Sequence, residues 1–301
     1  PNNRVVRELE FEVPGCKRAA IYWHRTIRDI LISMGFRQSR IDLCVFLLRR
    51  DNALVAILVM HVDDAIVRCD NDAIEYTRVK LNEANVKIRY FKQIAMGTPD
   101  QTLGCTWLEQ ESGSYVHQAE FILNKLKPID IAMLPRNGKG MPKGLTDDVY
   151  ALYRSALGNL IWILHTHADK GVDISFLACK RELLCIDHVH TLNKLIWEIR
   201  EHAHDAVFLP RFPDDDNYFV NGIADAAHAS RPDGSSQGGD VVGAARRDST
   251  LFCPFLGRSG KLKRVGNSSF DVECIEAVNL LDWTIIIVWA LSEFESGRIP
   301  T

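Results

Sequence analysis

Two adjacent aspartates, Asp63 and Asp64, lie between two apolar segments and are the residues in this sequence best placed to do chemistry. Residues 53–62 are apolar except for His61, and residues 65–67 are apolar throughout. This pattern predicts two buried strands joined by a tight turn that carries both carboxylates. Burying such a pair is unfavourable unless a cation such as Mg²⁺ binds it. The alternative is a hairpin tip whose aspartates face water.

A second pair of carboxylates could serve the same chemistry nearer the C-terminus. Asp225 follows an expected strand over 218–224, and Glu273 lies in the first turn of an expected long helix over 271–294. The two would converge on one cation if that helix packed against that strand. Each also has a simpler explanation, since aspartates often occupy turns and a glutamate in a first helical turn interacts favourably with the helix dipole.

Basic residues gather between these two carboxylates in the sequence. Beside a carboxylate site they could contact a phosphate backbone, although a run of charges is otherwise a solvated surface. They are Arg246, Arg247, Arg258, Lys261, Lys263 and Arg264. The whole chain is nearly neutral, with 36 Lys and Arg against 39 Asp and Glu, so any nucleic-acid surface must be local.

Other patterns with known chemistry are missing from the sequence. The paired histidines at 165/167, 188/190 and 202/204 have a spacing that points helical side chains in different directions. No G-x-x-x-x-G-K-[ST] or G-x-G-x-x-G motif occurs. The eight cysteines include no C-x-x-C pair, which favours reduced thiols over a zinc cluster or disulfides.

Alternating strands and helices would position these residues. In the first half, the expected elements are a helix over 17–34, strands near 43–48, 54–59 and 65–68, a helix over 72–85, strands over 86–91 and 102–108, and a helix over 118–127. In the second half they are a helix capped by Thr146, helices near 172–185 and 188–203, strands near 218–224, 239–246 and 250–256, and the long helix.

The chain ends and the apolar segments bear on localisation. The N-terminal residues are polar and charged, which is unlike a signal peptide. The longest apolar stretch, Trp283–Leu291, is about half the length that a bilayer span needs. We therefore expect an intracellular protein, cytoplasmic or nuclear, with no membrane partner. The abrupt first and last residues suggest a fragment of a longer protein.

Seven groups of short motifs follow one another along the chain. They are Val13–Trp23; Met34–Phe36 with Asp42–Phe46; His61–Asp64; Leu103–Gly104 with His117–Ile122; Tyr153–Gly158 with Thr166–Asp169; Ala224–Ala226 with Arg231–Gly239; and Arg258–Lys261 with Ser268–Glu273. In type and order they resemble motifs of the reverse transcriptase and ribonuclease H region of copia-type LTR retrotransposon Pol polyproteins. His61–Asp64, for example, stands where that family has YVDD.

The resemblance implies an α/β (α+β) fold in pieces. These are a partial reverse transcriptase palm over 1–128, a linker over 129–145, a helical thumb or connection over 146–208 and an incomplete ribonuclease H-like domain over 217–301. In that family, carboxylates hold two Mg²⁺ (or Mn²⁺) for nucleotidyl transfer and for cutting RNA. The resemblance thus assigns Asp63, Asp64, Asp225 and Glu273 as catalytic metal ligands. The implied partners are an RNA/DNA template–primer, an RNA–DNA hybrid and the remainder of the Pol polyprotein.

The sequence also departs from the family pattern. The third palm aspartate would precede Pro1, and the later ribonuclease H carboxylates would follow Thr301. His61 replaces a tyrosine, and Gly257 replaces a tryptophan, a change that typically costs about 3–5 kcal/mol. We therefore expect little or no polymerase or nuclease activity from this chain alone. One alternative is a degenerate remnant that only binds nucleic acid duplex; another is an unrelated helical scaffold protein.

Overall fold

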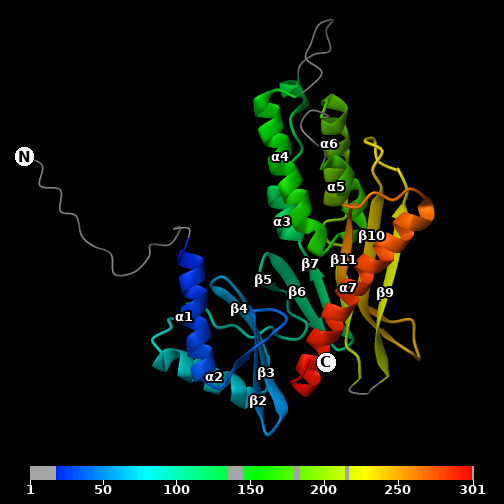
Figure 1. Ribbon diagram of the computed structural model, residues 1–301. Coiled ribbons are helices and arrows are strands. Elements are labelled where there is room, and N and C mark those ends of the chain that lie inside the picture. Colours follow the sequence, from blue (N-terminus) through cyan, green and yellow to red (C-terminus); the bar gives the residue numbers. More distant parts are fainter. Residues whose placement is uncertain (1–17, 135–144, 179–183, 214–216, 300–301) are drawn as a thin grey trace, which may run out of the picture. The chain divides into compact units, whose positions relative to one another are not determined.

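A computed structural model describes residues 18–134, 145–178, 184–213 and 217–299. The fold is mixed α/β, with three antiparallel sheets and seven α-helices in these residues (Figure 1). The chain forms two compact units. We call Pro1–Lys92 together with Val288–Thr301 the N-terminal unit, and Gln93–Ile287 the central unit. Most of the expected linker, residues 135–144, lies outside the described residues.

The N-terminal unit contains a four-stranded sheet in the order β1-β2-β3-β4. Two helices precede and follow these strands in the sequence, and the expected helices and strands of this unit up to residue 85 are confirmed. The elements are α1 (Ala19–Ser33), β1 (Arg37–Gln38), β2 (Val45–Arg50), β3 (Ala53–His61), β4 (Asp64–Cys69) and α2 (Asn71–Glu83).

Both helices of this unit pack against one face of the sheet. Phe46 pairs with Leu58 across β2 and β3, so both side chains lie on the same face. There they form a buried cluster with Ile27 and Leu31 of α1 and Ala73 of α2. Burial of these side chains removes apolar surface from water and orients α1 relative to the β3–β4 hairpin.

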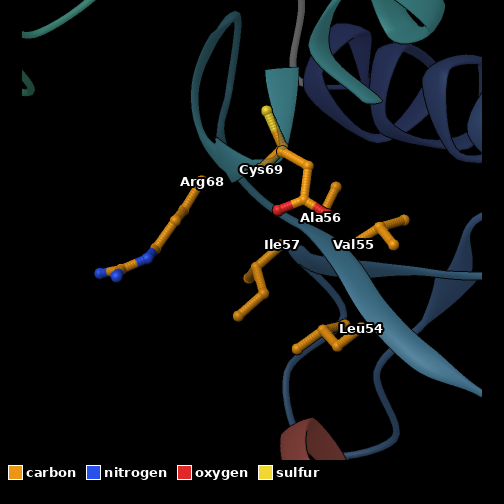
Figure 2. A pocket seen from close by; sticks show the side chains of 7 residues that line it. Leu54, Val55, Ala56, Ile57, Arg68 and Cys69 are labelled. Atoms are coloured by element: carbon orange, nitrogen blue, oxygen red, sulfur yellow. The ribbon is translucent and has the colours of Figure 1, made fainter. Parts of the chain in front are cut away.

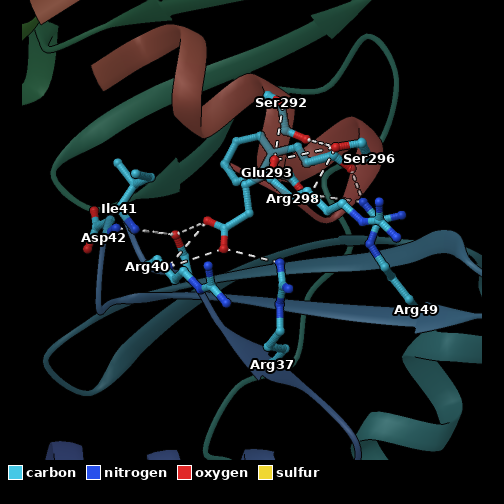
Figure 3. A network of polar contacts seen from close by, with 11 residues as sticks. Arg37, Arg40, Ile41, Asp42, Arg49, Ser292, Glu293, Ser296 and Arg298 are labelled. Carbon is cyan, nitrogen blue, oxygen red and sulfur yellow. Dashed lines mark hydrogen bonds and ion pairs between the residues drawn. The ribbon is translucent and has the colours of Figure 1, made fainter. Parts of the chain in front are cut away.

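The opposite face of this sheet receives the end of α7 (Ser269–Ser296). The carboxylate of Glu293 is fully buried there and accepts hydrogen bonds from Arg37 Nη2 at 3.1 Å and from Ser39 Oγ at 2.5 Å. Arg49 donates to the main-chain carbonyls of Glu293 and Phe294 (Figure 3). A buried carboxylate needs such donors, and here they attach residues 288–296 to the sheet.

The central unit begins with a four-stranded sheet in the order β5-β6-β7-β8. The strands are β5 (Asp100–Thr102), β6 (Cys105–Gln110), β7 (Gly113–His117) and β8 (Val207–Pro210). The expected strand over 86–91 is wrong, since these residues have no regular structure and Tyr90 and Phe91 are exposed. β8 pairs with β7 although the whole helical segment separates them in the sequence. The chain therefore leaves this sheet after β7, forms the helical segment and returns to the same sheet at β8.

The helical segment of the central unit has a core of its own. It comprises α3 (Ala119–Lys125), α4 (Asp147–Trp162), α5 (Gly171–Leu177) and α6 (Ile186–Glu201), with three short 3₁₀ turns, η1 (Ile131–Met133), η2 (Ile163–His165) and η3 (Ala168–Lys170). Thr146 caps α4 as expected, by accepting from the Val149 N–H. Buried Tyr153 donates to the Leu177 carbonyl at 2.8 Å, which joins α4 to α5. The predicted helices are confirmed, with α5 shorter than expected among the described residues.

The last sheet of the central unit has the order β11-β10-β9, and α7 covers one of its faces (Figure 1). Its strands are β9 (Tyr218–Ala227), β10 (Gln237–Arg246) and β11 (Phe252–Lys261). Two strand glycines allow the helix to approach closely. A Cβ atom on Gly222 would lie 2.7 Å from Leu280 Cδ1, and one on Gly238 would lie 2.5 Å from Glu276 Oε2. Because both glycines face α7, every second residue counted from them along each strand faces the helix as well.

Candidate metal-binding and nucleic-acid-binding residues

The tip of the β3–β4 hairpin carries Asp63 and Asp64. His61 pairs with Asp64, so Val62 and Asp63 form a two-residue turn. Val62 has φ 57°, in the left-handed region that β-branched residues rarely adopt. The Trp23 indole Nε1 of α1 donates to the Val62 carbonyl at 2.7 Å. Because Val62 is itself 57% exposed, this hydrogen bond, and not burial of the valine, fixes the turn to the rest of the unit.

Both aspartates at this tip are exposed to solvent. The expectation that burial would force the pair to bind a cation is therefore wrong, and the water-facing alternative describes the position of the side chains. Asp64 pairs with His61, whereas Met60 belongs to the cluster beneath the helices. Since side chains alternate along a strand, Asp64 lies on the sheet face away from α1 and α2. Its carboxylate oxygens can bind a cation from the solvent, or a cation that accompanies a polyanion.

Asp225 and Glu273 are not brought together by the structure. Asp225 pairs with Gly239, and its neighbour Ala224 pairs with Asp240. The face containing Gly222, Ala224 and Asp240 is the one that α7 covers, so Asp225 points to the other side of the sheet. Glu273 is exposed on α7. The expected convergence of these two carboxylates is wrong, because the strand register places Asp225 one residue out of phase with the helix-facing positions.

A different pair of carboxylates, one from β10 and one from α7, meets between the sheet and the helix. Asp240 and Glu276 are 2% and 4% exposed. Arg258 forms an ion pair with Asp240 and lies 4.8 Å from the ring centre of Trp283, while Asn279 donates to Glu276 at 2.9 Å. Burial, together with the nearby charge of Asp240, raises the pKa of Glu276. The sequence analysis missed this pair, although an aspartate within the small and apolar strand 237–245 was a signal for it.

Carboxylates neutralise several of the basic residues that were expected to contact nucleic acid. Arg258 is paired with Asp240, Lys261 with Asp233 at 2.6 Å, and Arg246 with Asp248 at 2.6 Å. The Lys261 ammonium and the Ser235 hydroxyl lower the pKa of Asp233 well below its usual range. A phosphate backbone would have to compete with these partners.

The remaining basic residues have a different environment. Arg247 follows β10, and its guanidinium lies 5.4 Å from the ring centre of Phe219 in the neighbouring strand β9. Lys263 and Arg264 are exposed in the loop after β11. Of the six basic residues that the sequence analysis singled out, these three have no carboxylate partner among the described residues.

A surface cavity of the N-terminal unit lies away from the carboxylate tip. It has a volume of about 290 Å³ and is lined by residues 54–57 of β3 and 68–70 around the end of β4. Figure 2 shows the Arg68 side chain extending away from Leu54, Val55 and Ile57. These residues are at the opposite end of the β3–β4 hairpin from Asp63. The cavity therefore adds no group to the candidate metal site.

Two further observations concern the described residues as a whole: one bears on metal binding and the other on membrane insertion. No group of three or more His, Cys, Asp or Glu side chains is arranged to hold a metal ion in the part of the chain that the structure describes. One helix there, α7, is long and apolar enough to cross a membrane by length and composition, with a mean hydropathy of 1.7. The expectation considered only Trp283–Leu291, which Thr284 alone interrupts, whereas α7 continues on both sides of that stretch.

The chain is thus a mixed α/β protein with an exposed acidic hairpin, and sequence comparison found one distant similarity that bears on its origin. It is 22% identical over 216 residues to the Retrovirus-related Pol polyprotein from transposon RE1 of Arabidopsis thaliana. The match covers 68% of this chain and 14% of that protein. This distant similarity supports a retrotransposon Pol origin. No protein-family model matches the chain, and no solved structure matches it significantly.

Proposed function

We propose that this chain is a segment of a copia-type retrotransposon Pol polyprotein that carries part of a reverse transcriptase palm and an incomplete ribonuclease H-like domain. The order of the sequence motifs supports the proposal, as does the similarity to the RE1 polyprotein. The single structural observation that carries it is the β3–β4 hairpin, whose tip presents two exposed carboxylates on a turn held by Trp23.

The carboxylates at this tip fit a divalent cation only in part. Asp63 and Asp64 supply the hard oxygen ligands that Mg²⁺ or Mn²⁺ prefers. Two-metal nucleotidyl transfer needs further ligands, and the described residues bring no third carboxylate to them. When bound, the cations would activate a primer hydroxyl and stabilise the leaving oxygen. The role of this chain is then to present Asp63 and Asp64 to the template–primer, with the remaining ligands supplied by the rest of the Pol polyprotein.

The second candidate function is a remnant that binds nucleic acid duplex without cutting or copying it. The separation of Asp225 from Glu273 favours this alternative for the C-terminal sheet. Arg247, Lys263 and Arg264 would then contact the phosphate backbone of an RNA–DNA hybrid. Arg246, Arg258 and Lys261 would contribute less, because they interact with carboxylates.

The proposed setting is intracellular, either cytoplasmic or nuclear, and without a membrane partner. One face of α7 packs on the sheet, where Leu280 lies against Gly222 and the Glu276 side chain lies beside Asp240. The charged side chains of Asp240 and Arg258 on that side of the helix would be unfavourable in hydrocarbon, which supports a setting without a membrane partner.

A primer-extension assay tests the proposal. With an RNA template, a DNA primer and Mg²⁺ or Mn²⁺, the chain alone is expected to give no extended product, and the same protein is expected to leave the RNA of a hybrid uncut. Clear extension would contradict the claim that the ligand set is incomplete. Hybrid binding that weakens with salt and survives Asp63→Asn would favour the remnant; extension gained on adding upstream Pol sequence would favour the polymerase segment.

A further inference from the structure

Cys185 and His188 form a close thiol–imidazole pair at the start of α6. The Cys185 Sγ atom lies 3.1 Å from His188 Nδ1. Both side chains are half-buried, so small molecules can reach them. A thiol within hydrogen-bond reach of an imidazole is the arrangement by which proteins activate a cysteine nucleophile. The pair lies outside all the carboxylate and basic residues considered above.

The pair lies at the N-terminus of a long helix. Cys185 is the N-cap residue of a 16-residue helix, and the His188 backbone N–H donates to the Cys185 carbonyl at 3.1 Å. The sulfur therefore lies at the positive end of the helix dipole. The Cys185 backbone N–H also donates to His188 Nδ1 at 3.3 Å, so the one lone pair of this nitrogen is shared between the N–H and the thiol, and the imidazole is held beside the sulfur.

Other cysteines of the chain lie in less favourable surroundings. Burial raises the pKa of the Cys69, Cys105 and Cys253 thiols, which makes them weaker nucleophiles. Cys274 is exposed on α7, with no histidine contact among the described residues. Cys274 therefore serves as an internal standard for a thiol whose reactivity depends on exposure alone.

We propose that Cys185 is a nucleophilic thiol, activated by His188, that small soft electrophiles such as hydrogen peroxide modify. As the sulfur attacks one peroxide oxygen, His188 Nδ1 takes the thiol proton. The S–O bond forms and the O–O bond breaks. The departing hydroxide takes the proton from His188 and leaves as water. Cysteine is oxidised to sulfenic acid and the peroxide is reduced.

The test measures alkylation of each cysteine by iodoacetamide at pH 7, followed by mass spectrometry of the peptides. Cys185 is expected to react about tenfold faster than the more exposed Cys274, as expected for a thiol beside an imidazole. His188→Gln should bring Cys185 to the rate of Cys274. Glutamine retains an acceptor for the Cys185 N–H, as in a capping box, but does not take up the proton. His190→Gln, an exposed position on the same helix, should leave the rate unchanged.

Several outcomes would overturn the proposal. Equal or slower labelling of Cys185 relative to Cys274 in the unmodified chain would do so without any variant. So would an unchanged Cys185 rate in His188→Gln. A final experiment adds hydrogen peroxide and then dimedone, which traps sulfenic acid; the adduct is expected on the Cys185 peptide and is lost in His188→Gln. An adduct equally distributed over the cysteines would show that Cys185 has no special reactivity.

Discussion

The indole N–H of Trp23 donates to the carbonyl of Val62 at 2.7 Å, and this contact joins two motifs that are 39 residues apart in the sequence. Trp23 ends the first of the retrotransposon-like motifs, and Val62 precedes the two aspartates of the third. The contact holds a β-branched residue in the left-handed region, where such residues are unfavourable by about 1–3 kcal/mol. A strained residue next to candidate ligands is consistent with a hairpin tip that is held in one conformation to present Asp63 and Asp64.

Replacing Trp23 by phenylalanine removes this donor but keeps an aromatic side chain. We expect the free energy of opening of the β3–β4 hairpin to fall by about 1 kcal/mol, the usual contribution of one hydrogen bond. Hydrogen–deuterium exchange of peptides covering residues 53–69 measures it. Trp197→Phe, at an exposed position of α6, is the control and should leave that exchange unchanged. Equal exchange in both variants would show that the Trp23 contact does not hold the tip.

Glu276 should make stability depend on pH. Its pKa is raised in the folded chain by burial and by Asp240, so the folded state holds this proton more tightly than the unfolded chain does. The resulting stabilisation is complete below the usual glutamate range and is lost as pH rises through the raised value. Glu276→Gln, which resembles the protonated acid, should remove this loss. Urea unfolding at several pH values measures it, with exposed Glu273→Gln as the control. An identical pH slope in Glu276→Gln would contradict the assignment.

His117 should give a pH dependence of the opposite sign. Burial, and then the neighbouring His204, lower the pKa of His117, while its Nδ1 atom accepts from the Ala119 N–H at the start of α3. The unfolded chain therefore binds this proton more tightly, and the stabilisation is lost as pH falls through the usual histidine range and then the lowered value. His117→Asn keeps an acceptor without titrating, so its unfolding midpoint should vary less with acidification. His190→Asn should behave as the unmodified chain; a slope unaltered by His117→Asn would exclude this cause.

Glu293 should contribute strongly to the stability of the N-terminal unit. Its buried carboxylate binds Arg37, Ser39 and the Arg40 N–H. Removing one partner from a buried ion pair costs about 3–5 kcal/mol, and the half-exposed Arg37 reduces this to roughly 2–4 kcal/mol for Glu293→Ala. Hydrogen exchange of β2 peptides measures the effect. Glu295→Ala, exposed two residues later, should change it by less than about 0.5 kcal/mol. Similar exchange in the two variants would show that the carboxylate does not attach the end of α7.

Local sequence patterns predicted the elements better than their partners. The apolar spacing of α1, the Thr146 cap of α4 and the paired apolar runs of β3 and β4 are all local, and the structure confirms them. The pairing of β7 with β8 depends on contacts across the whole helical segment, which no local pattern contains. Residues 86–91 alternate as a strand would but have no neighbouring strand to pair with.

The site residues show the same difference between local patterns, which were predictable, and long-range packing, which was not. The hairpin of Asp63 and Asp64 was predictable because two apolar runs and a turn specify it. Which face of β9 meets α7 depends on where the helix can approach, and Gly222 and Gly238 decide this. Glycines within strands often mark a close approach, so they were the available signal that Asp240, and not Asp225, lies beneath the helix.

The central claim is that Asp63 and Asp64 bind a divalent cation beside nucleic acid, and hybrid binding with and without Mn²⁺ tests it most directly. Fluorescence anisotropy of a labelled RNA–DNA hybrid would be measured in Mn²⁺ and in EDTA. We expect Mn²⁺ to tighten binding by the unmodified chain and by Asp51→Asn, a control at the turn between β2 and β3, but not by Asp63→Asn/Asp64→Asn. An equal effect of Mn²⁺ on all three proteins, or none on any, would contradict the claim.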